Sequence, residues 1–291
     1  MTAPEAPRSA GWSRRTVLRA FAPVPLLAVG GCGASASHSA DASAAGASAT
    51  ASSTRGPSRS ASPAADARSV ALPQPEVSQA PGVTDAVALT FHGDGSPELA
   101  QALLAEAEKA DARLTVLAVG QWLAQYPQMA ERVLKGGHEL GNHTENHLDI
   151  DAMSEFRAYD EIERCAQRLE QLTGSRGRWF RQSQAQHASS SVRAAATRAG
   201  YGTLLSYDLD PLDYTDPGTT AIERNVLTRI RGGDVVSMHL GHPETVTALP
   251  VILAGLSARG LRAVTASELF PPSGAAAPSA LSQLSRPTQN S

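Results

Sequence analysis

Two histidines four residues apart are the sharpest chemical signal in this sequence. They lie in the run Gly141–His147, which reads Gly-Asn-His-Thr-Glu-Asn-His. At this spacing, His143 and His147 fall on one face of a helical turn, where both imidazoles reach a single metal ion. The same spacing also occurs on solvated helix faces, so the pair favours a metal site but needs support from its surroundings.

Further polar side chains stand at the ends of other expected strands. They are His92 and Asp94 at the first, Arg181 at the fourth, Asp208, Asp210 and Asp213 at the fifth, and His239 at the sixth. In folds built from βα repeats, active sites assemble at the carboxyl ends of the strands. Charged groups gathered there are costly unless they are paired or bound to metal, so the set predicts a catalytic site.

The strands that position these residues follow from the hydrophobic pattern. From residue 84 onward, short β-rich runs alternate with helical patterns, which is typical of a parallel sheet. The predicted fold is α/β, an irregular seven-stranded (β/α) barrel, one strand short of the eight-stranded form. The expected strands are Val87–Gly93, Arg113–Gly120, Glu139–His143, Arg178–Gln182, Thr203–Asp208, Val235–Leu240 and Leu261–Ala266.

Helix signals occur between the strands. Ser96 supplies a capping hydroxyl directly before Pro97, which suits the first position of a helix. The segment Ser154–Leu172 carries apolar residues at three- and four-residue spacing and is expected to cover the outside of the barrel. These residues are Phe156, Tyr159, Ile162, Leu169 and Leu172.

Composition restricts the folded part of the 291-residue chain to residues 83–270. Residues 33–82 and 271–291 are rich in Ala, Ser and Pro and cannot bury enough surface to offset their ordering entropy, so we expect a disordered linker and tail. Residues 84–272 hold 24 acidic against 17 basic side chains, more acidic than the net charge of −3 of the whole chain. A nucleic-acid partner is therefore disfavoured, and a monomer is expected.

The first 32 residues resemble an export signal. Arg14 and Arg15 precede the short apolar run 21–29, a pattern similar to twin-arginine signals. The run is too short for a permanent transmembrane helix. It leads into Leu27–Cys32, which resembles a lipobox, so Cys32 is expected to carry a lipid that anchors the exported protein to the outer face of the cytoplasmic membrane. The alternative is an ordinary signal peptide with an incidental cysteine.

Five motifs, in order along the chain, resemble those of the NodB-homology polysaccharide deacetylases, carbohydrate esterase family four. The His-Thr-x-x-His pattern of residues 143–147 is similar to the second family motif. The first, third, fourth and fifth are matched by Thr90–Pro97, Trp179–Arg181, Asp210–Tyr214 and Gly233–His239. The resemblance covers about residues 84–270 and implies the irregular barrel of the NodB-homology type.

The resemblance also implies roles for single residues. His143 and His147 match the two histidines of the family's Asp-His-His site, which holds zinc or a similar divalent ion. His239 matches the general acid that protonates the departing sugar amine. Arg181 and Asp213 match residues that orient the base and tune the acid, respectively.

The first motif departs from the family, which has adjacent aspartates as general base and metal ligand. Aligned without a gap, His92 takes the base position and Gly93 leaves the metal without a carboxylate. With one inserted residue, Asp94 recovers the ligand and His92 remains the base, a role open to imidazole at neutral pH. We favour the second alignment, because it keeps Pro97 near the family's proline and lets flanking glycines bend the backbone toward the ion.

Three hypotheses follow. The leading one is a metal-dependent deacetylase acting on an acetylated polysaccharide, with peptidoglycan first by location and a chitin-like glycan second. The rival is a catalytically silent, carbohydrate-binding lipoprotein, which is suggested by the altered first motif and by milder changes such as Tyr214 for Trp and Ser237 for the Leu that walls the acyl pocket. A metal-storage or sensory lipoprotein is weaker, because nothing in it requires Arg181 or Asp213.

Overall fold

The computed structural model describes residues 75–272. The predicted signal at 1–32, most of the predicted linker and almost all of the predicted tail lie outside the described residues. The folded part begins before residue 83, contrary to the expected linker boundary, because strand β1 (Glu76–Val77) pairs in parallel with strand β5 (Leu204–Leu205). Ala80 is also buried, so these residues add apolar surface to the core.

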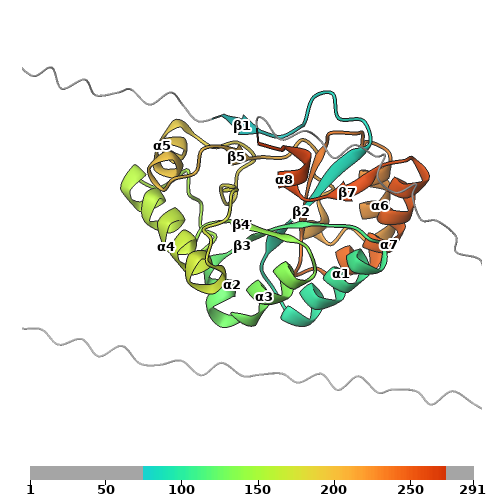
Figure 1. The fold of residues 1–291 in the computed structure, drawn as a ribbon, viewed down its shortest axis with the longest axis horizontal. Helices are drawn as coiled ribbons and strands as arrows, with labels where there is room; N and C mark the ends of the chain where they lie inside the picture. The colour runs from blue at the N-terminus through green and yellow to red at the C-terminus, as the bar shows by residue number, and fades with distance from the viewer. Residues whose placement is uncertain (1–74, 273–291) are drawn as a thin grey trace, which may run out of the picture. The chain divides into compact units, whose positions relative to one another are not determined.

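Parallel strands form an irregular barrel, as predicted (Figure 1). At its centre, β2 (Ala86–Gly93) pairs with three strands, β3 (Thr115–Ala118), β6 (Val235–His239) and β7 (Arg262–Val264). On the other side, β3 pairs with β4 (Glu139–Asn142). Single-residue bridges continue the ring, since Phe180 pairs with Asn142 and Leu204 while Leu209 pairs with Val236.

The ladder is weakest around residues 178–208, where two full strands were predicted. Arg178–Gln182 contributes only the bridges at Phe180, and the strand expected at Thr203–Asp208 is reduced to β5. The physical reason is a buried side chain. The carbonyls of Leu205 and Ser206 accept hydrogen bonds from the Arg181 guanidinium, so these groups are satisfied without a neighbouring strand.

Helices surround the barrel (Figure 1). Ser96 caps the first of them as predicted, because its Oγ accepts hydrogen bonds from the backbone N–H groups of Glu98 and Leu99. Within residues 75–272, no helix is both long and apolar enough to cross a membrane. The helices are α1 (Pro97–Lys109), α2 (Gly120–Gln125), α3 (Gln128–Lys135), α4 (Glu155–Thr173), α5 (Ser190–Arg198), α6 (Thr219–Leu227), α7 (Pro243–Ala258) and α8 (Ala266–Leu269), with a 3₁₀ turn at Asp213–Thr215.

Helix α4 begins after Ser154 as expected, and the predicted apolar face is correct in its middle, where Ile162 and Leu169 are buried. Phe156 is 70% exposed and Leu172 is exposed as well, so the predicted apolar face is wrong at both ends. The buried positions follow helical spacing and include the predicted Ile162 and Leu169: Ala158, Glu161, Ile162, Cys165, Ala166 and Leu169. The small side chains of Ala158, Cys165 and Ala166 allow close packing between these larger residues.

Candidate active site

Three histidine side chains converge at the carboxyl ends of β2 and β4. His92 lies on β2, His143 directly follows β4, and His147 lies in the loop beyond it. One ring nitrogen from each lies within 4.8 Å of the others. The ring centroids of His92 and His143 are 4.1 Å apart, and those of His143 and His147 are 4.8 Å apart. Nitrogens at this separation can ligate one metal ion.

The free nitrogens of this histidine triad fit such an ion. Nδ1 of His92 and Nε2 of His143 are buried and have no hydrogen-bond partner. The opposite nitrogen of each ring is occupied, since His143 Nδ1 lies 3.1 Å from the carbonyl oxygen of Arg181 and His92 Nε2 lies 3.1 Å from Oγ of Ser237. Buried unpartnered polar atoms are costly, and three imidazoles that leave further positions open are typical of a catalytic divalent site.

Electrostatics keep the triad in the form that binds metal. Burial lowers the pKa of His92 and of His143 well below the ordinary value for histidine, and the neighbouring histidines and Arg181 add to the effect. Burial also lowers the pKa of His147. The three imidazoles are therefore neutral at physiological pH, and a neutral imidazole has the lone pair that a metal ion needs.

Asp94, the third ligand in the alignment that we favoured, lies outside the triad. Its side chain is exposed, and Oδ1 accepts a hydrogen bond of 2.7 Å from the backbone N–H of Gly95. Strand β2 runs without interruption through Gly93, where an added Cβ would lie only 2.9 Å from the Cα of Ala118. The geometry thus favours His92 as the third ligand, in place of the base role predicted for it.

The segment between the two motif-two histidines is an irregular loop and not the helical turn that the spacing predicted. Thr144 and His147 adopt left-handed backbone angles, with φ of 67° and 54°. Side chains replace the helical hydrogen bonds here. Asn142 Oδ1 accepts from the N–H of Thr144 at 2.9 Å, and Thr144 Oγ1 accepts from the N–H of His147 at 3.1 Å.

Two acidic residues hold this loop to its surroundings. Glu145 is buried and accepts hydrogen bonds from Arg168 on α4, at 2.6 Å, and from Gln121 on α2, at 3.0 Å. Glu161 on α4 accepts from both the backbone N–H and the side-chain amide of Asn146, at 2.8 and 2.6 Å. Sequence reasoning missed both carboxylates, although Glu145 lies inside the motif itself.

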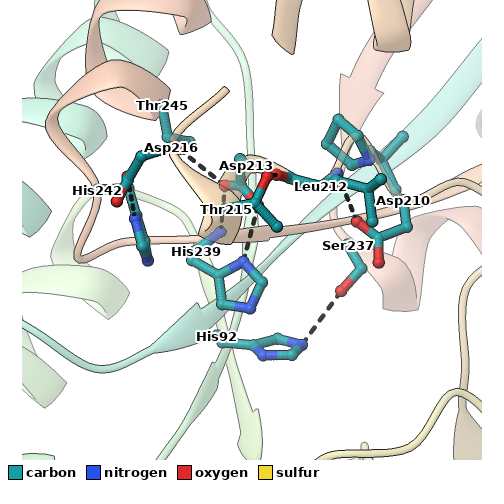
Figure 2. Close-up of polar contacts among 12 residues, drawn as sticks. His92, Asp210, Leu212, Asp213, Thr215, Asp216, Ser237, His239, His242 and Thr245 are labelled. Carbon is teal, nitrogen blue, oxygen red and sulfur yellow. Dashed lines mark hydrogen bonds and ion pairs between the residues drawn. The ribbon is translucent and has the colours of Figure 1, made fainter. Parts of the chain in front are cut away.

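His239 and Asp213 form a second unit beside the triad (Figure 2). Nδ1 of His239 lies 2.8 Å from Oδ1 of Asp213, whose other oxygen accepts from the His239 N–H and from the hydroxyl of Thr245. The His239 ring is 4.3 Å from the His92 ring. Because Asp213 occupies Nδ1, the Nε2 atom of His239 is the one available for proton transfer, which agrees with the pairing that the resemblance implied.

Arg181 is wholly buried below the triad and acts as a donor throughout. Its guanidinium donates to Thr90 Oγ1 at 2.9 Å and to Ser237 Oγ at 3.4 Å, in addition to the two carbonyls described above. Burial lowers the pKa of Arg181 to about 9, so the side chain is still charged at neutral pH. Arg181 is connected to His92 through Ser237.

A cavity of about 300 Å³ opens beside His92, His147 and His239. Its walls are mostly polar or aromatic, and several of them were not predicted from the sequence. The lining residues that sequence reasoning missed are Gln184, Ala185, Gln186 and Tyr207. The lining residues are His92, His147, Gln184, Ala185, Gln186, Tyr207, Asp210, Tyr214, Ser237 and His239.

Comparisons with known proteins agree with this geometry. Residues 80–204 match the sequence profile described as polysaccharide deacetylase. The chain is 31% identical over 195 residues to a peptidoglycan-N-acetylglucosamine deacetylase of Bacillus cereus, a match that covers 63% of this chain and 87% of that protein.

Solved structures show the same fold. A family 4 carbohydrate esterase from Streptomyces lividans, in complex with acetate, is 26% identical with a TM-score of 0.58, over 62% of this chain and 92% of that one. A pseudoenzyme of the same family from Bacillus anthracis is 22% identical with a TM-score of 0.64, over 68% and 70%. The likeness to the pseudoenzyme concerns the fold alone. The fold, the ordered motifs and the identity to the Bacillus cereus protein together show that this chain belongs to the polysaccharide deacetylase family.

Proposed function

We propose that this protein is a metal-dependent deacetylase that removes N-acetyl groups from a cell-wall or extracellular sugar polymer. The observation that carries the proposal is one cavity that is lined both by His92 and His147 of the histidine triad and by His239 of the His239–Asp213 pair. Peptidoglycan is the first substrate class, supported by the activity named for the Bacillus cereus relative. A chitin-like glycan is the second.

The triad would hold a divalent ion, and zinc suits three neutral imidazoles best. Such an ion supplies Lewis-acid polarisation of the acyl carbonyl and of the attacking water. His239 presents Nε2 to the cavity and can deliver a proton to the departing sugar amine, while Asp213 stabilises the charged imidazolium during the transfer.

With His92 placed among the ligands, the base that accepts the proton of water must come from elsewhere. Asp210 lines the cavity, and no other described carboxylate does so. One of its oxygens accepts a hydrogen bond of 2.7 Å from the N–H of Leu212, which fixes the side chain. Burial raises the pKa of Asp210, which makes its carboxylate a stronger base. We therefore assign the base role to Asp210.

The experiment is a measurement of acetate release by the zinc-loaded protein from chito-oligosaccharide and from peptidoglycan. The parent should release acetate, and Asp210→Asn should lower the rate by about a hundred- to ten-thousandfold while zinc affinity stays unchanged. A parent that binds zinc tightly but releases no acetate from either polymer would overturn the proposal.

That same result would favour the second candidate, a catalytically silent, carbohydrate-binding protein. One observation supports this alternative, because neither aspartate of the family's first motif has a counterpart at the triad. Retention of the parent on immobilised peptidoglycan, without acetate release, would establish it.

Export and lipid anchoring at the outer face of the cytoplasmic membrane remain part of the proposal. They are supported by Arg14, Arg15 and Cys32 in the sequence. Cys165, the other cysteine, is buried on α4 and is not available for lipidation.

A further inference from the structure

The hydroxyl of the buried Ser237 lies against Nε2 of the His92 ring. Ser237 is carried by β6, whose register places it opposite Thr90 on β2. Its Oγ lies 3.1 Å from Nε2 of His92, and the residue is only 2% exposed (Figure 2). The contact lies at the wall of the cavity, and the direction of its hydrogen bond determines which ring nitrogen of His92 carries the proton.

The neighbours of Ser237 indicate that direction. Nη1 of Arg181, which can only donate, lies 3.4 Å from Oγ of Ser237 and 2.9 Å from Oγ1 of Thr90. Thr90 in turn donates to the carbonyl of Val236 at 2.6 Å. The serine oxygen thus accepts from Arg181 and has a second lone pair for the Nε2–H of His92.

The opposite direction is unfavourable. If Ser237 donated to Nε2, the proton of the neutral ring would sit on Nδ1, which is buried without any acceptor. A buried N–H without a partner is among the costlier defects in a folded protein. If His92 donates, Nδ1 instead carries a lone pair that faces His143 and His147.

We propose that Ser237 is a positioning residue that fixes His92 in the Nε2–H tautomer, so that Nδ1 is the metal-binding atom. The inference rests on the metal site of the proposed function. It extends the role of Arg181, whose carbonyl oxygen already holds the Nδ1–H of His143. Through its backbone and its guanidinium, one arginine thereby sets the tautomers of two ligands.

The proposal also explains two departures from the family together. An aspartate in place of His92 would carry no ring proton and would need no acceptor at position 237. A histidine there needs one, and the hydroxyl of Ser237 supplies it where the family has a leucine. The two residues thus form a functional pair on neighbouring strands.

Two measurements on the full chain test this pair. The first is calorimetric zinc affinity for the parent, Ser237→Ala and Ser237→Thr, with Ser267→Ala as the matched control. Ser267 also accepts a partly buried hydrogen bond, from the indole N–H of Trp179, but lies on α8 away from the histidines. Ser237→Ala should bind zinc about ten- to hundredfold more weakly, whereas Ser237→Thr, which keeps the hydroxyl, and Ser267→Ala should stay near the parent.

The second measurement is ¹⁵N NMR of histidine side chains in the metal-free parent, with His92→Gln used to assign the His92 signals. It should show the Nε2–H tautomer for His92, and it requires no folded variant at position 237. A proton on Nδ1, or equal zinc affinity of the parent and Ser237→Ala, would overturn the inference while leaving the proposed function standing. A parent that binds no zinc would overturn the proposed metal site, and the NMR result would still decide the tautomer.

Discussion

The carboxylate of Asp213 contacts His239 twice, through the ring Nδ1 at 2.8 Å and through the backbone N–H at 2.9 Å. This double contact fixes both the position of the ring and its protonated nitrogen. The Asp213 carboxylate also accepts a hydrogen bond of 2.7 Å from the hydroxyl of Thr245, so it has little freedom to turn away. These three contacts support the acid role that we propose for His239.

Asp213→Asn should lower deacetylation by about a hundred- to ten-thousandfold without weakening zinc binding. The amide has a single acceptor oxygen, so it loses one of the two contacts to His239 and cannot stabilise the imidazolium, whereas Asp213 is not part of the histidine triad. Steady-state acetate release and calorimetry measure the two effects. The matched control is Asp216→Asn, because Asp216 lies at the same distance of 2.8 Å from Nδ1 of His242, a histidine that does not line the cavity. Equal losses in both variants would contradict the assignment.

His92→Ala should weaken zinc binding at least ten- to hundredfold, whereas Asp94→Ala should bind zinc as the parent does. The structure places a buried, unpartnered nitrogen of His92 in the triad and leaves Asp94 exposed outside it. Calorimetric titration of the metal-free proteins gives both affinities. The reverse order of the two variants would restore the alignment with one inserted residue.

A third prediction concerns pH and stability at the opposite end of β6. Burial, together with nearby Asp234, raises the pKa of Asp208 to about 6, whereas an unfolded aspartate titrates near 3.8. The folded state therefore binds more protons than the unfolded state between these values, and stability falls as pH rises through this window. Relative to Asp208→Asn, the parent should lose about 1 kcal/mol between pH 4 and pH 7, a figure reduced for partial exposure.

Urea denaturation of both proteins across this pH range provides the measurement for Asp208. The asparagine keeps an oxygen that can accept the hydrogen bond from Val235, which lies 2.8 Å from the parent carboxylate. Stability curves that run parallel from pH 4 to pH 7 would show that Asp208 does not titrate in this window.

Cys32→Ala should release the exported protein from the membrane fraction into the medium. The cysteine is the expected lipid acceptor, and Cys165 is buried in the core and cannot replace it. Fractionation of cells followed by immunoblotting is sufficient. If the variant still sediments with membranes after a high-salt wash, lipidation of Cys32 does not provide the anchor.

Periodicity and motif order predicted the barrel well, because six of the seven expected ranges contain an observed strand, although Thr203–Asp208 contains only the two residues of β5. The sequence pattern could not show whether the segment Arg178–Gln182 pairs as a full strand. Whether its backbone joins a ladder depends on Arg181, whose guanidinium satisfies distant carbonyls that become neighbours only after folding. Likewise, the spacing of His143 and His147 identified two members of the histidine triad but suggested a helical turn, since side-chain hydrogen bonds from Asn142 and Thr144 are not visible in spacing.

The choice between His92 and Asp94 needed three-dimensional information for a related reason. Sequence alone permits a bulge at Gly93, and only the close approach of β3 shows that the strand continues straight and that position 93 has no room for a side chain. In the sequence, Ser237 is recognisable only as a serine where the family has a leucine. Its contact with His92 joins residues that are 145 positions apart in the sequence.

Hydrogen bonds tie the loop of residues 143–147 to α2 and α4. None of them involves the unpartnered nitrogens of the histidine triad. Glu145 and Glu161 hold the loop through Arg168, Gln121 and Asn146, so the ion contributes little to its ordering. In this respect the domain differs from small zinc domains that unfold when a chelator removes the metal. We therefore expect the protein to stay folded after losing its ion, and with export as proposed its metal content would follow the supply in the medium and not the conditions under which the chain folded.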